Sequence, residues 1–204
     1  MAGSREEILR VLRASGASPL PLPELPAVAP GSPGGGPEAL IARFVRSLES
    51  VGGRCVRVPE RAGLDAAVRA LPESVAAKQV VSCVPGVGRS DLALDTVADP
   101  HQLAGVDFAV VPGELGVAEN GAVWVTEQKV HPRAVLFLTQ QLAIVLDAAA
   151  LVPDLHAAYA RLPLGAKGFG LFISGPSKTA DIEQALVLGA HGARGCTVLL
   201  VGRG

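Results

Sequence analysis

One stretch decides how the rest of the chain is interpreted: Gly170-Leu171-Phe172-Ile173-Ser174-Gly175-Pro176-Ser177-Lys178-Thr179-Ala180-Asp181-Ile182-Glu183. Its first four residues are apolar and predict a buried strand. Gly175-Pro176 ends this strand, because proline cannot donate to a sheet ladder and glycine adopts unusual backbone angles. Ser177 and Thr179 are candidate N-caps, and the acids after them suit a first helical turn. We therefore expect a strand, a glycine turn and a helix start whose free N–H groups bind an anion. The structural alternative is a helix that uses these hydroxyls only to cap itself.

The composition indicates an α/β protein. Hydrophobic residues make up 49% of the chain and aromatic residues only 3%, so the core consists of Val, Leu, Ile and Ala, as in a parallel sheet covered by helices. The net charge of −1 and the lack of a basic stripe disfavour nucleic-acid binding. No uncharged run is longer than Ala134 to Leu146, which is too short to span a bilayer. The charged, amphipathic start of the chain is unlike a signal peptide and predicts a cytoplasmic protein.

The three cysteines, Cys55, Cys83 and Cys196, are far apart in the sequence. They show none of the CxxC or Cys/His spacings of zinc or iron–sulfur sites, so we expect no metal and no cofactor in this chain. Buried, reduced thiols are the expected state of all three.

The order of predicted elements gives a three-layer α/β domain with a mixed sheet region. Ser4 and Glu7 have the spacing of a capping box. The proline-rich segment 16–37 predicts an extended linker, so the first helix should form an arm outside the main domain. We therefore expect residues 1–37 to form this helix and linker and residues 38–204 to form the α/β domain. The apolar runs 122–125, 134–138 and 142–146 are joined by connectors too short for helices, so part of this region should be meandering strands. The expected helices are 4–14, 38–51, 64–71 and 147–162, the last one interrupted by Pro153, and the expected strands are 55–58, 79–84, 107–111, 168–173 and 196–201.

Four side chains are candidates for chemistry. Glu119 lies on a glycine turn beside Asn120-Gly121, where a desolvated carboxylate can act as nucleophile or base, and its alternative is a surface turn acid. Asp181 is either a site residue or an acid that stabilises the first turn of the expected helix through its dipole. Glu183 is interpreted as such a first-turn acid. Lys178 can bind an anion or remain solvated. His191 lies among glycines and is either structural or catalytic.

A second glycine-containing stretch follows the expected strand 79–84. It reads Pro85-Gly86-Val87-Gly88-Arg89 and resembles a phosphate loop only in its glycines. It lacks the lysine–serine ending of a P-loop and the spacing of a dinucleotide fingerprint.

Two sequence blocks together resemble a known family. The run from Ser174 to Glu183 followed by Gly189-Ala190-His191-Gly192 resembles the signature of the LutC/YkgG family of LUD-domain proteins, and Gly116-Val117-Ala118-Glu119-Asn120-Gly121-Ala122 resembles the family's second block. The resemblance extends over about residues 38–201. It implies a Rossmann-like fold similar to the NagB/ribose-5-phosphate isomerase/CoA-transferase group.

The resemblance also implies a function. Such a protein takes part in the oxidation of L-lactate to pyruvate beside iron–sulfur partner proteins, which would carry the redox clusters. We expect a small anionic ligand, with Ser174, Gly175, Ser177, Lys178, Thr179, Asn120 and Gly121 as binding residues and Glu119, Asp181 and His191 as candidate catalytic residues.

One departure from the family pattern raises an alternative. The family usually has threonine where this chain has Asn120, and Ala118-Glu119-Asn120-Gly121 is similar to the Ser-Glu-Asn-Gly block of CoA transferases. In those enzymes the glutamate is the acyl-accepting nucleophile. A stand-alone acyl- or CoA-handling enzyme with Glu119 as nucleophile is therefore the second hypothesis, and a non-catalytic sensing or assembly module is the third.

Overall fold

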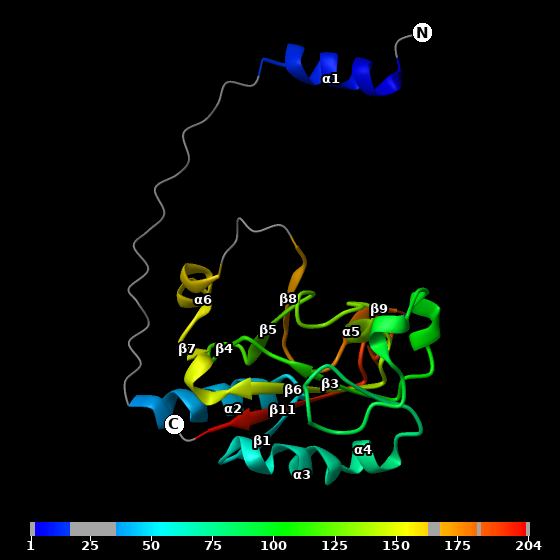
Figure 1. The fold of residues 1–204 in the computed structure, drawn as a ribbon. Helices are drawn as coiled ribbons and strands as arrows, with labels where there is room; N and C mark the ends of the chain where they lie inside the picture. Colours follow the sequence, from blue (N-terminus) through cyan, green and yellow to red (C-terminus); the bar gives the residue numbers. More distant parts are fainter. Residues whose placement is uncertain (1–2, 17–35, 163–167, 183–184, 203–204) are drawn as a thin grey trace.

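The computed structural model describes residues 3–16, 36–162, 168–182 and 185–202. A five-stranded parallel sheet in the order β1-β11-β6-β3-β2 forms the centre of the fold (Figure 1). Its strands are β1 (Arg54–Val58), β2 (Val80–Ser82), β3 (Phe108–Pro112), β6 (Gln141–Asp147) and β11 (Gly195–Val201). A four-stranded sheet in the order β7-β4-β5-β8 contains β4 (Leu115–Val117), β5 (Ala122–Thr126), β7 (Leu151–Val152) and β8 (Gly170–Ile173). A two-stranded hairpin contains β9 (Lys178–Ile182) and β10 (Ala185–Leu188).

Helices accompany these sheets. The α-helices are α1 (Ser4–Ala14), α2 (Gly36–Ser50), α3 (Leu64–Arg69), α4 (Pro72–Ala76), α5 (Val135–Leu138) and α6 (Leu155–Arg161). The short 3-10 helices are η1 (Arg61–Gly63), η2 (Leu94–Thr96), η3 (Pro100–Leu103) and η4 (Ala148–Ala150). None of the helices in the described residues is both long and apolar enough to cross a membrane.

The central sheet is buried on both faces, as its Val- and Leu-rich strands predict. In β3, Phe108 and Val110 pack into one core while Ala109 and Val111 pack into the other. The strand period of two produces this alternation. One core is completed by α3 and the other by α2 together with β5. The predicted α/β architecture with a mostly parallel sheet is confirmed.

The strands of the second sheet belong to the segments that connect strands of the central sheet. The connection from β3 to β6 contains the antiparallel pair β4–β5 and the single-turn helix α5, and the connection from β6 to β11 contains β7, α6, β8 and the hairpin. The three apolar runs of region 122–146 were predicted to be partly meandering strands, and this prediction was wrong. The middle run forms helix α5, and β5 and β6 on either side of it belong to different sheets. β5 pairs antiparallel with β4 and β8, which lie outside this region.

Two local predictions were wrong. Helix α1 begins after Gly3 and has no side-chain cap hydrogen bond, so the Ser4–Glu7 capping box does not form. The expected helix 147–162 is an α-helix only from Leu155. Asp147 is the last residue of β6, residues 148–150 form the 3-10 helix η4, and Pro153 follows the short strand β7 before Asp154 caps α6. The predicted linker lies largely outside the described residues.

Helix α1 matches its predicted bounds and presents an apolar stripe to solvent. Ile8, Val11 and Leu12 are 58%, 56% and 62% exposed. Helix α2, which begins two residues earlier than predicted, instead buries Ile41, Phe44 and Leu48.

A carboxylate joins two strands at the amino-terminal edge of the central sheet. Asp107 Oδ2 accepts hydrogen bonds from the backbone N–H groups of Lys78 (2.8 Å) and Gln79 (3.1 Å). These bonds, the one from Gln79 foremost, lower the pKa of Asp107 below its ordinary value of 3.8. The charged carboxylate therefore stabilises the start of β2 against β3.

We expect Asp107→Asn to weaken the pH dependence of stability on the acid side. A lowered folded-state pKa stabilises the fold above the unfolded pKa, and this stabilisation is lost as pH falls through the folded value. The urea midpoint of the wild type should fall between pH 6 and pH 3 more than that of the variant. Asp95→Asn removes the same charge at an exposed position and is the control. Equal acid dependence in Asp107→Asn and the wild type would contradict this role.

Candidate functional site

The stretch after β8 forms a hairpin where a helix was predicted. β8 ends at Ile173, and Lys178–Ile182 is strand β9, which pairs antiparallel with β10. The helix prediction depended on local capping residues. It was wrong because an apolar partner strand follows within a few residues, and the β-branched Thr179, Ile182 and Val187 favour an extended pair. Asp181 therefore lies in β9, and Glu183 lies outside the described residues.

This correction changes the physical basis of the predicted anion site. A helix start would have supplied free N–H groups and a dipole. In the structure the Ser177 N–H donates to the Ala193 carbonyl (2.8 Å), and the Gly189 N–H donates to the Ser177 carbonyl (3.0 Å). These two backbone hydrogen bonds connect the turn at Ser177 to segment 189–193. Because the Ser177 N–H and carbonyl are occupied in this way, a ligand here must be bound mainly by side chains.

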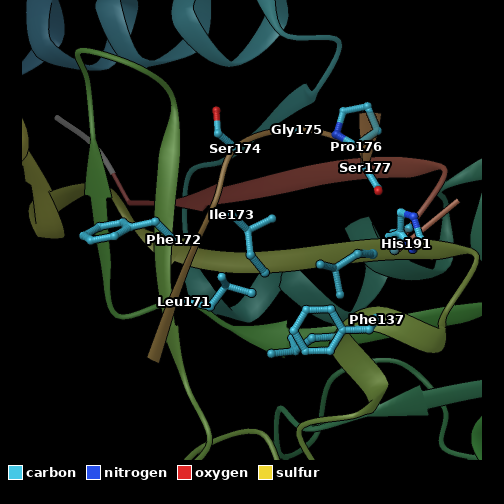
Figure 2. A pocket seen from close by; sticks show the side chains of 13 residues that line it. Phe137, Leu171, Phe172, Ile173, Ser174, Gly175, Pro176, Ser177 and His191 are labelled. Atoms are coloured by element: carbon cyan, nitrogen blue, oxygen red, sulfur yellow. The ribbon is translucent and has the colours of Figure 1, made fainter. Parts of the chain in front are cut away.

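A cavity of about 290 Å³ lies at this turn, and we call it the hairpin cavity (Figure 2). Its wall is mostly apolar and includes Phe137, Leu171 and Ile173. Its polar side chains are Ser174, Ser177 and His191, which lines the cavity together with Gly192 and Ala193. Figure 2 shows the Ser177 and His191 side chains next to each other at one end of the cavity. The structure therefore brings Ser174, Gly175, Ser177 and His191 together around one space.

The Ser174 hydroxyl has a structural partner. Its Oγ donates to the Asn120 carbonyl at 2.7 Å. The side-chain Oδ1 of Asn120 in turn accepts from the Ala122 N–H at 3.1 Å. This chain of contacts joins the two sequence blocks, which are far apart in the sequence. Of the two serines in the cavity wall, Ser177 is therefore the better candidate for contact with a ligand.

Two glycines in these blocks lie against the carboxyl-terminal end of α2. Gly121 has φ +68°, and a Cβ there would lie 2.5 Å from the Leu48 backbone. Gly175 has φ +71°, and a Cβ there would lie 2.9 Å from the Val51 carbonyl oxygen. Only glycine fits both the backbone angle and the space. Gly121 and Gly175 thus have a packing role, which the binding assignment from sequence did not include.

Glu119 is exposed and lies at the start of a helix. Its Oε2 accepts from the N–H of Leu155, the first residue of α6, at 3.2 Å. A carboxylate in this position satisfies a free helix N–H and interacts favourably with the helix dipole. Glu119 is not among the residues that line the hairpin cavity. Glu119 and His191 therefore do not meet in this cavity.

The structure likewise does not place Lys178 or Thr179 in the hairpin cavity. Both belong to β9 and are not part of the described wall of the hairpin cavity. The Lys178 side chain is exposed and lies near Gly52 in the turn after α2, where a Cβ would lie 3.6 Å from its Nζ. The binding roles of Lys178, Thr179 and Asp181 stay predictions.

The cysteines are free thiols, and burial raises all three pKa values. Those of Cys55 and Cys83 rise to about 11 and that of Cys196 to about 12. Among the described residues, no three or more His, Cys, Asp or Glu side chains gather as metal ligands. A four-iron cluster takes four thiolates, so this donor set does not fit one.

Sequence reasoning missed the residues that α5 contributes to the cavity. Leu136 and Phe137 line it, and Phe137 is 42% exposed. Phe137 also packs edge-on against Phe169, with ring centroids 6.3 Å apart. The apolar run 134–138 was noticed, but its placement beside β8 depends on a crossover that local patterns do not reveal.

Comparison with known proteins places both blocks in one family. The LUD domain family model matches residues 98–201, half of the chain. "Lactate utilization protein C" of Bacillus pumilus is 33% identical over 100 residues, which cover 46% of this chain and 42% of the relative. The protein of the same name from Geobacillus kaustophilus is 29% identical over 123 residues, which cover 57% of this chain and 48% of the relative. The chain thus matches less than half the length of these relatives.

A solved structure has the same fold. A DUF162 family protein from Deinococcus radiodurans superimposes with a TM-score of 0.58 and 16% sequence identity. The match covers 81% of this chain and 98% of that protein. At this identity the likeness concerns the fold alone.

We expect Gly121→Ala to destabilise the protein more than Gly86→Ala. Both glycines have positive φ, at +68° and +72°, but a Cβ on Gly86 meets nothing within 4 Å. The Gly86 variant should lose only the backbone strain, about 1 kcal/mol. The Gly121 variant must also displace the backbone of α2 and should lose at least about 2 kcal/mol more. Urea unfolding measures both, and equal losses would contradict the packing role of Gly121.

Proposed function

Because the chain belongs to the LUD-domain family, we propose that it is a lactate utilization protein C-like subunit that acts beside iron–sulfur partner proteins in the oxidation of L-lactate to pyruvate. The names of the Bacillus and Geobacillus relatives, both lactate utilization protein C, support this role. The observation that carries the proposal is the hairpin cavity, because the two family blocks meet beside it through the Ser174–Asn120 hydrogen bond.

The hairpin cavity has the chemistry for a small hydroxy or keto acid. The Ser177 hydroxyl and the His191 imidazole can donate hydrogen bonds to a carboxylate or a carbonyl oxygen. Phe137 and Ile173 form an apolar wall against which a methyl group can pack. Such a mostly apolar pocket with a few convergent polar groups is typical of small-molecule sites. Electron transfer belongs to the partners in this proposal, because the three scattered, protonated thiols do not fit a cluster.

The acyl-transfer alternative gains no specific support from the geometry. A nucleophilic Glu119 would need a cavity in front of its carboxylate, whereas this group is hydrogen-bonded to Leu155 at the start of α6. Glu119 stays a candidate from sequence similarity alone. The non-catalytic sensing module would use the same hairpin cavity and differs only in the outcome of the activity test.

We expect Ser177→Ala and His191→Ala each to lower lactate oxidation by the reconstituted complex. Loss of one hydrogen bond to a charged group costs about 1.5 to 3 kcal/mol, or roughly ten- to a hundredfold in kcat/KM. His156→Ala is the matched control, because it removes an exposed histidine of α6 that does not line the hairpin cavity. Undiminished lactate oxidation by the partner proteins without this chain would overturn the proposal. Unchanged kcat/KM in both the Ser177→Ala and the His191→Ala variant would show that the ligand does not bind in the hairpin cavity.

We expect Glu119→Gln to leave lactate oxidation unchanged and to lower stability by less than about 1 kcal/mol. The amide oxygen can still accept from Leu155, and only the charge next to the helix start is lost. Kinetics of the complex and urea unfolding of the chain measure the two quantities. A hundredfold loss of activity in a stably folded variant would restore Glu119 as a reacting group.

A further inference from the structure

A second cavity lies where the strands of the central sheet end. All five strands run parallel, so their carboxyl ends meet at one edge. A cavity of about 450 Å³ at this edge is lined by Cys83 after β2, Gly113 after β3, Asp147 of β6, Val201 of β11 and Arg61 after β1. We call it the strand-end cavity. In parallel α/β sheets, ligands bind in the crevice outside the carboxyl ends of the strands.

The strand-end cavity continues into a neighbouring hollow. A space of about 360 Å³ shares Cys83, Pro85 and Lys129 with it and is further lined by Asp95 and His131. Neither space shares a wall residue with the hairpin cavity. The glycine-containing loop after β2, which resembled a phosphate loop only in its glycines, contributes Pro85 to both walls.

Two cations reach the strand-end cavity from separate loops. Arg61 comes from η1, and Lys129 comes from the segment between β5 and α5. Both side chains are exposed to solvent on this side of the sheet. The ion pairs that the structure describes are formed by other side chains: Arg10, Arg54, Arg57, Arg69, Arg89, Arg133 and His101. The positive charges of Arg61 and Lys129 are therefore placed where they can hold an anion.

One carboxylate lines the same cavity. Asp147 Oδ1 accepts the Ala149 N–H at 2.8 Å, which fixes the side chain at the end of β6. A carboxylate has about four acceptor positions, so Asp147 retains capacity for a further donor. A ligand that fits all three side chains therefore carries both a negative group and a hydrogen-bond donor.

We propose that the strand-end cavity binds an organic anion that carries a phosphate or carboxylate together with hydroxyl groups. Arg61 and Lys129 hold the anionic group, and Asp147 accepts a hydrogen bond from a hydroxyl. The neutral Cys83 thiol forms part of the wall between the two spaces. This site is separate from the hairpin cavity and does not depend on the proposed role in lactate oxidation.

The first test is thermal unfolding of the purified chain with four probes: D-gluconate, glycerol 3-phosphate, ADP and, as the neutral control, glycerol. We expect at least one anion to raise Tm in a concentration-dependent manner and glycerol not to do so, because a ligand of the folded state stabilises it by mass action. Which anion does so separates a carboxylate from a phosphate ligand. Arg61→Gln combined with Lys129→Gln should lower the affinity at least tenfold, and Asp147→Asn should lower it less.

Matched variants separate this site from general charge effects. Lys78→Gln removes an exposed cation beside a pocket at the opposite edge of the sheet, and its backbone N–H bond to Asp107 is retained. His191→Ala alters only the hairpin cavity. Both should keep the Tm shift of the wild type. The proposal is overturned if none of the three anions raises Tm at millimolar concentration, or if the shift survives in the Arg61/Lys129 double variant.

The second test uses the wild-type chain and therefore does not depend on the folding of a variant. Cys83 and Cys55 are both partly buried, and burial raises the pKa of each to about 11, so they form a matched pair of thiols. An anion in the strand-end cavity should slow alkylation of Cys83 by iodoacetamide several-fold and leave Cys55 unchanged, as measured by peptide mass spectrometry. Equal rates for Cys83 with and without the anion that raises Tm would place that anion elsewhere and overturn the proposal.

Discussion

The close approach of two glycine turns to the end of α2 is the constraint on which the rest of the site depends. A Cβ at Gly121 would overlap the Leu48 backbone, and one at Gly175 would overlap the Val51 carbonyl. The same helix buries Phe44 and Leu48 between the two sheets. Any shift of α2 therefore moves both turns, and with them the Ser174–Asn120 hydrogen bond that connects the two family blocks. Backbone packing thus fixes where the hairpin cavity lies.

This constraint separates two kinds of residue within one motif. Gly121, Gly175 and Ser174 position the backbone, whereas Ser177 and His191 present polar groups to the hairpin cavity. Glu119, in the same block as Gly121, satisfies the start of α6. A sequence block can therefore be characteristic of a family although most of its residues do not contact a ligand. Several of its residues are required for packing, because a helix, a turn and a strand meet at this place.

Much of the fold was predictable because its signals are local and strong. The parallel strands β3, β6 and β11 are continuous apolar runs, and α2 has a clear helical period. The hairpin β9–β10 was not predicted because Ser177, Thr179 and Asp181 also suit the start of a helix. The partner strand that decides between the two structures is β10, which lies beyond these residues in the sequence. In the candidate site, the structure places Ser177 and His191, both named from the sequence, at one cavity, because segment 189–193 returns to the turn at Ser177. The contributions of α5 and of the strand ends depend on crossover paths that no local pattern contains.

The position of β11 has a consequence for how this chain reaches its native state. The strand lies between β1 and β6 and pairs with both along its length. Until it is in place, β1 has no neighbour in the sheet, although it belongs to the first part of the central domain to be synthesised. Pairing across such a sequence separation is entropically costly and slows folding. β11 follows the other four strands of the central sheet in the sequence and joins β1 to the β6-β3-β2 part of this sheet. A nascent chain that still lacks β11 therefore leaves the facing edges of β1 and β6 unpaired.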